Sequence, residues 1–162
     1  ASDVYKRQQK ELHDRYGIRY TEIVGQIKTL RANTNYLNTT IEKNQREIAE
    51  LRQFINDCMM YKKLKIYSTN EEKAEDKEAY YQKHAQELNA FHDAKFSLES
   101  RNVDLSAVTA SNIKILQKRL EQAEQEQQNL REQQLQNERE AKELQSYQKE
   151  IDTYLGKKHE DI

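Results

Sequence analysis

Apolar residues recur at alternating steps of four and three along the stretch from Ile23 to Cys58. This spacing constrains the fold more than any other feature, because it places one narrow apolar row along a single helix. The row has polar interruptions at Thr34 and Asn44. A helix this long with so much polar surface is not stable alone, so the spacing predicts that it lies against another helix.

The composition also favours long helices with a narrow buried core. The 162 residues include no proline and only three glycines, and 34% of them are charged. Without proline, little interrupts helical hydrogen bonding. High polarity with regular apolar spacing favours a buried row over a filled globular core. We therefore predict an all-α fold, a long antiparallel coiled-coil hairpin with a short helical tip.

The first long helix is expected over residues 9–67. Its apolar row comprises Ile23, Ile27, Leu30, Leu37, Ile41, Ile48, Leu51 and Ile55. Tyr16 and Tyr20 extend this row backward at the same spacing. Gly17 and Gly25 lie off the row, where each costs the helix about 1 kcal/mol relative to alanine.

Residues 68–105 are expected to form the helical tip. Thr69 and Glu72 have the spacing of a capping box, so the first long helix should end just before them. A second helix should follow over residues 70–100, with aromatic side chains on its buried face. The predicted core of the tip consists of Tyr61, Leu64, Tyr81, His84, Leu88, Phe91 and Leu98, widened by Tyr80, Ala94 and Phe96.

The second long helix is expected over residues 106–156. Its apolar row comprises Ile113, Leu116, Leu120, Leu130, Leu144, Ile151 and Leu155, with glutamine or asparagine at several positions between them. Gly156 suits the position just after a helix end, so residues 157–162 should fray. Because both rows are interrupted by polar residues, a homodimeric four-helix arrangement stays open beside the monomeric hairpin.

The sequence shows no catalytic constellation, and we predict no catalytic, cofactor-binding or metal-binding residue. The four histidines lack the spacing of metal ligands. Cys58 is the only cysteine, and its place in the apolar row favours an inert thiol. Lys62, Lys63 and Lys65 are compatible with contact to a nucleic-acid backbone, although lysines near a helix end more often face the helix dipole.

Charge and targeting signals limit the remaining classes of function. The net charge of −1 gives the whole chain no basic footprint for nucleic acid. We find no signal peptide, long apolar run or lipidation motif, which predicts a cytoplasmic protein without a membrane partner.

Residues 1–8 resemble the in-frame translation of a transposase-inserted sequencing adapter. We therefore expect them to be a library scar on a reading frame that was cut upstream.

The middle of the chain carries a resemblance to a known family. The runs Cys58-Met-Met-Tyr-Lys-Lys-Leu-Lys-Ile-Tyr67 and Lys77-Glu-Ala-Tyr-Tyr-Gln-Lys-His-Ala-Gln-Glu-Leu88, with the later Phe91-His-Asp-Ala94, resemble the C-terminal region of mobilisation relaxases of Gram-positive bacteria. The likeness covers residues 45–156. That family usually has a large aromatic residue and a proline before its last helix, where this chain has Val103-Asp-Leu-Ser106.

The resemblance implies that the parent protein is a DNA strand transferase. Its upstream nuclease domain would nick plasmid or transposon DNA with a tyrosine and a histidine-bound metal. The nuclease motifs do not occur in this chain, so the resemblance assigns no catalytic residue. The chain would be a tail that mediates dimerisation or contacts with DNA-transfer accessory proteins, with no small-molecule ligand. Two alternatives stay open, a coiled-coil scaffold or spacer and a helical hairpin that binds nucleic acid.

Overall fold

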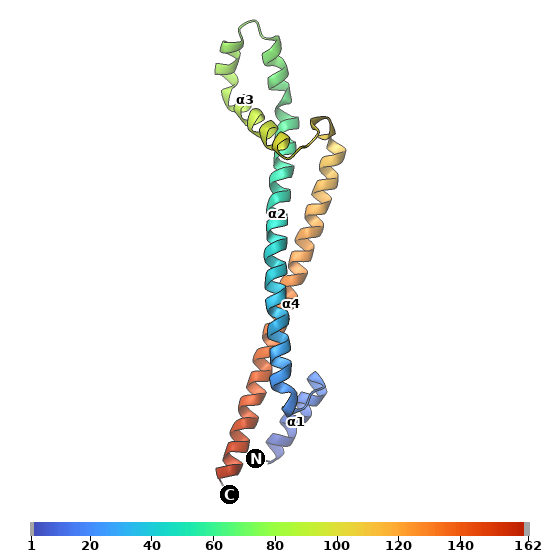
Figure 1. Cartoon of the computed structure of the whole chain (residues 1–162), viewed down its shortest axis with the longest axis vertical. Coiled ribbons are helices and arrows are strands. Elements are labelled where there is room, and N and C mark those ends of the chain that lie inside the picture. Colours follow the sequence, from blue (N-terminus) through green and yellow to red (C-terminus); the bar gives the residue numbers. More distant parts are fainter. Residues whose placement is uncertain (1, 161–162) are drawn as a thin grey trace. The chain divides into compact units, whose positions relative to one another are not determined.

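The computed structural model describes residues 2–160 and is all-α, which confirms the predicted fold class (Figure 1). In chain order it contains α1 (Ser2–Tyr16), the 3₁₀ helix η1 (Tyr20–Glu22), α2 (Ile23–Lys73), α3 (Lys77–Ser100), the 3₁₀ helix η2 (Leu105–Ala107) and α4 (Ala110–Glu160). These elements form two compact units. Unit 1 contains the chain up to Lys43 and from Gln127 onward, and unit 2 spans Asn44–Glu126, so α2 and α4 contribute to both.

The chain leaves the helix at Gly17, where the sequence predicted one continuous helix over residues 9–67. Gly17 has a φ of +65°, in the left-handed region that costs glycine no side-chain clash. Its N–H donates to the His13 carbonyl at 2.9 Å and ends α1. The prediction was wrong because it treated this glycine as a small cost inside a helix rather than as the end of one.

The core of unit 1 is mainly aliphatic and joins α1, α2 and α4. Its buried members are Leu12, Ile18, Ile23, Ile27, Leu30, Leu144, Tyr147 and Ile151. Complete burial of one such aliphatic side chain stabilises the fold by about 1.5–3 kcal/mol. The Tyr20 hydroxyl donates to Asp152, whereas Asn38, further along the chain, accepts from Gln134. The two long helices therefore run antiparallel in unit 1.

Residues 2–8, which resemble a sequencing adapter, belong to α1 in this structure. The Tyr5 ring stacks on the Tyr154 ring with centroids 4.8 Å apart, and the Gln8 amide donates to Glu150. The adapter origin stays a prediction. These residues nevertheless contact α4 and form part of the packing of unit 1.

In unit 2, α2 continues past the break predicted at residues 68–72. The Thr69 hydroxyl donates to the Lys65 carbonyl at 3.2 Å, so it bonds back into α2 instead of capping a new helix. The residue that caps α3 is Asp76, whose carboxylate accepts from the Ala79 N–H at 3.0 Å. Figure 1 shows α3 returning beside the end of α2.

The connection from α3 to α4 turns at Asn102, which has a φ of 59°. Asparagine tolerates this left-handed conformation better than most residues. Asp104 then caps η2, because its carboxylate accepts from both the Ser106 hydroxyl and the Ser106 N–H. These two hydrogen bonds lower the pKa of Asp104. Since η2 occupies this segment, α4 begins at Ala110 and not near Ser106 as predicted.

The other end of α4 also differs from the prediction. The helix continues through Gly156 to Glu160, where the sequence predicted an end near Leu155. Gly156 keeps a helical backbone and not the left-handed conformation of a capping glycine. Of residues 157–162, which were expected to fray, the last two lie outside the described residues.

The apolar rows lie on the sides of α2 and α4 that are removed from solvent. Ile23, Ile27, Leu30, Leu37, Ile41, Ile48, Ile55, Ile113, Leu144 and Ile151 are buried, and Leu51, Leu116, Leu120, Leu130 and Leu155 are half-buried. In unit 2 the buried Asn44 amide donates to the Ala123 carbonyl at 3.0 Å. In unit 1 the buried Asn137 Nδ2 has no hydrogen-bond partner among the described residues. Because most of its row residues are only half-buried and Asn137 has an unsatisfied amide, α4 contributes less apolar packing than α2.

Candidate interaction site

Unit 2 gathers side chains from α2, α3 and α4 around an aromatic pair. The Tyr61 and Phe91 rings stack with centroids 5.2 Å apart and planes 20° apart. The buried cluster consists of Cys58, Tyr61, Leu64, Phe91, Ala94, Leu98 and Ile113. Four residues predicted for the tip core thus come together with Ala94, which was expected to widen it, and with Ile113, which was predicted for the coiled-coil row.

Three other residues predicted for the tip core lie outside this cluster. Leu88 is completely buried, whereas Tyr81 is half-buried and its hydroxyl donates to Asn89 at 3.0 Å. His84 is half-buried, with its ring 5.3 Å from the Tyr67 ring and 4.5 Å from the Tyr80 ring.

The geometry of α3 explains part of this difference. Its backbone is kinked at His84, where φ is −121° and ψ is 26°, so a single helical face does not continue across this residue. Phe96, which was expected to widen the buried face, is 73% exposed. That expectation was wrong, because positions 94 and 98 carry the buried side of this turn and Phe96 lies between them.

A buried carboxylate at Asp57 links α2 to α3, and sequence reasoning missed it. Asp57 is 6% exposed, and it accepts from the Ser97 hydroxyl at 2.6 Å and from the Gln53 amide at 3.0 Å. These two donors replace part of the hydration that burial removes. Because one donor comes from a distant helix, no local pattern marks Asp57 as buried.

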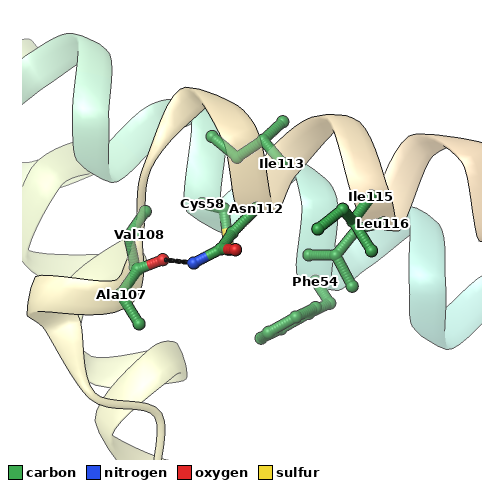
Figure 2. A pocket seen from close by; sticks show the side chains of 8 residues that line it. All are labelled: Phe54, Cys58, Ala107, Val108, Asn112, Ile113, Ile115 and Leu116. Carbon is green, nitrogen blue, oxygen red and sulfur yellow. Dashed lines mark hydrogen bonds between the residues drawn. The ribbon is translucent and has the colours of Figure 1, made fainter.

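An open cavity of about 250 Å³ lies between α2 and the start of α4 (Figure 2). Its lining includes Phe54 and Cys58 from α2, and Val108, Ile115 and Leu116 from the other side. In Figure 2 the Asn112 amide donates to the Ala107 carbonyl at 2.7 Å and closes the turn that forms one wall. Ile115 is 59% exposed, so an apolar side chain stands at the mouth of an apolar cavity.

Cys58 lies at the wall of this cavity and is 3% exposed. Burial raises the pKa of its thiol, the negative charge of Asp57 raises it further, and Arg101 opposes the shift. The thiol therefore stays protonated at neutral pH. A protonated, buried thiol is a poor nucleophile, which agrees with a packing role.

In unit 1 several tyrosines in or beside the mainly aliphatic core bond to acids. The Tyr147 hydroxyl donates to Glu11 at 2.9 Å, and the Tyr16 hydroxyl donates to Glu143. Burial raises the pKa of both phenols, and these hydrogen bonds raise it further. For Tyr20 the hydrogen bond to Asp152 is the main cause of a raised pKa. The phenols are therefore held in their neutral, donating form.

Among the side chains that the structure describes, no group of three or more histidine, cysteine, aspartate or glutamate residues is arranged to hold a metal ion. A search of the same residues finds no helical stretch with both the length and the apolarity of a membrane span. Comparisons of the chain with protein-family models, with curated proteins and with solved structures found no match. Unit 2, with its aromatic core and open apolar cavity, is the candidate interaction site.

Proposed function

We propose that this chain is a protein-interaction segment in which the paired helices display unit 2 to a partner. One observation carries the proposal. Large apolar side chains stand exposed on unit 2, at Met59, Ile66, Phe96 and Ile115, with exposed fractions of 47–73%. Of these, Ile115 lines the open apolar cavity, and an exposed apolar group beside such a cavity is typical of surfaces that bind another protein.

The resemblance to mobilisation relaxases suggests which parent protein and which partner are involved. It covers residues 45–156, which include all of unit 2 except Asn44. On this proposal the chain is the tail of a relaxase and contacts a second copy or a DNA-transfer accessory protein, while an upstream domain cuts the DNA. The reading frame upstream in the source DNA should then encode a histidine-containing nuclease domain. A frame without such a domain would end the relaxase proposal.

A transfer assay tests the role of the segment within the parent protein. Deleting residues 45–156 should leave nicking at the transfer origin intact and lower the frequency of plasmid transfer. Loss of nicking would contradict a tail that acts only in protein contacts.

A spacer is the second candidate, and the long polar faces of α2 and α4 favour it, since such surfaces hold two ends apart without binding. Replacing residues 45–156 by an unrelated antiparallel helical hairpin of equal length separates the two functions. If the segment binds a partner, the frequency of plasmid transfer should stay low. If it is only a spacer, the replacement hairpin should restore the frequency of transfer.

A further inference from the structure

Beside the cavity of Figure 2, unit 2 has a second hollow between α2 and α4, which we call the methionine groove. It has a volume of about 550 Å³, and its lining includes Met59, Met60, Ile113, Lys62, Lys63 and Lys114. Met59 and Met60 are the only methionines of the chain. Methionine side chains are flexible and polarisable, so they adapt to different apolar partners.

The apolar line of the groove extends along α2. Ile66 follows Met59 by seven residues, which places both on the same face of the helix. Ile66 is 57% exposed and Met59 is 47% exposed. Exposed apolar side chains one heptad apart, with Lys62 and Lys63 between them, suit an amphipathic third helix.

The charged side chains that line the groove have one sign. Residues 58–69 and 106–120 contain no aspartate or glutamate, although the whole chain carries a net charge of −1. Together they contain six cationic side chains, all exposed, namely Lys62, Lys63, Lys65, Lys114, Lys118 and Arg119. The salt bridges to glutamate within the described residues involve other cations, Arg15, Arg52 and Lys95. The nearest acid before the first stretch, Asp57, is buried and bonded to Ser97.

We propose that the methionine groove binds an acidic amphipathic helix of a partner protein. The apolar face of that helix would lie on Met59 and Met60, and its carboxylates would face Lys62, Lys63 and Lys114. Nucleic acid fits this surface less well, because its floor is apolar and the Tyr61 ring is buried against Phe91 and cannot stack on a base. This inference rests on the proposed function and names the chemistry of the partner.

A synthetic peptide tests the inference directly on the full chain. The probe is a fluorescently labelled helix of about 18 residues, with leucine on one face and glutamate on the other. We expect saturable binding by fluorescence anisotropy that weakens as salt rises. A second peptide with lysine in place of each glutamate should not bind. No binding of the acidic peptide at low salt, or equal binding of both peptides, would overturn the inference.

Substitutions locate the binding to the groove. The double variant K62E/K63E should weaken binding at least about tenfold, as should Met59→Asp, which places a charge on the apolar floor. The matched control is K28E/K142E, which makes the same change in net charge at exposed lysines of unit 1 and should bind as the parent chain does. Circular dichroism confirms that each variant is folded. Equal weakening in the control and groove variants would show attraction by net charge alone and refute the groove.

A labelled single-stranded oligonucleotide is the competing probe. If it binds more tightly than the acidic peptide, and K62E/K63E abolishes that binding, the surface is a nucleic-acid site and the inference is wrong. Weak oligonucleotide binding that the variants do not alter agrees with the peptide site. These readouts use no transfer assay, so they can fail while the proposed function holds, and the reverse is also true.

Discussion

Units 1 and 2 are built from the same two long helices but are packed in different ways. Unit 1 packs mainly aliphatic side chains together with tyrosines whose hydroxyls bond to acids. Unit 2 inserts α3, stacks Tyr61 on Phe91, buries the Asp57 carboxylate and leaves apolar side chains exposed around two hollows. A repeated four-three spacing thus specifies a pair of helices in both units, whereas the side chains between the repeats decide whether the core is mainly aliphatic or is built around a stacked aromatic pair.

The largest expected effect comes from opening the core of unit 1. Leu144→Ala removes a completely buried side chain and should cost about 2–5 kcal/mol. Hydrogen exchange should then show lost protection in unit 1 and little change in α3. The matched variant in unit 2 is Leu98→Ala, also at a completely buried leucine, and its effect should have the opposite distribution. Equal loss throughout the chain in both variants would show that the two clusters are not separate.

A smaller effect is expected from the buried carboxylate of unit 2. Asp57→Ala leaves the Ser97 hydroxyl and the Gln53 amide without their acceptor, which should cost about 1–3 kcal/mol in urea unfolding. Asp93→Ala, at an exposed position of α3, is the control and should have little effect. Equal stability of the two variants would mean that Asp57 does not link α2 to α3.

Alkaline pH should distinguish the units by their tyrosines. The folded-state pKa values of Tyr16, Tyr20 and Tyr147 are raised above that of an unfolded tyrosine. Their contribution to stability is therefore fully present below about pH 10 and is lost as pH rises toward the folded-state values. Thermal unfolding of unit 1 should shift to lower temperature in this range.

Phenylalanine variants assign that alkaline shift. Tyr147→Phe should cost about 1 kcal/mol at pH 7 through the lost hydrogen bond to Glu11, and should flatten the alkaline decline. Tyr36→Phe alters a tyrosine that is 70% exposed and should leave the pH profile unchanged. A profile that Tyr147→Phe leaves as steep as before would argue against this source of pH dependence.

The smallest effect concerns the cavity wall. Because the pKa of Cys58 is raised and its side chain is buried, iodoacetamide at pH 8 should modify it at least about tenfold more slowly than glutathione. A rate that rises on addition of urea would locate the protection in the fold of unit 2. Modification as fast as that of glutathione would contradict the burial of Cys58.

The sequence predicted what depends on helical periodicity alone. The row from Ile23 to Ile55 follows from spacing within one helix, and no knowledge of its partner was needed to expect it. The same holds for the all-α class, since the absence of proline and the polarity of the flanks are properties of the chain itself.

Features set by distant partners were not predictable from spacing. The burial of Asp57 depends on Ser97, and the burial of Leu12 depends on a break at Gly17 that turns α1 onto the core of unit 1. Thr69 illustrates a local ambiguity, because its hydroxyl can cap a new helix or bond back into the old one. Because Asp76 caps α3 instead, the Thr69 hydroxyl is left to bond back into α2.

The hydrogen bond from Asn44 to the Ala123 carbonyl has a consequence for folding. A seven-residue repeat allows two helices to slide past each other by one repeat and bury apolar side chains again. In such a slipped pairing the Asn44 amide would face Leu116 or Leu130 in place of the small Ala123, and a bulky side chain that keeps the buried amide from a carbonyl would leave it unsatisfied at a cost of about 1–3 kcal/mol. A single polar residue in the apolar row therefore selects the correct register, because it destabilises misaligned pairings while the helices associate.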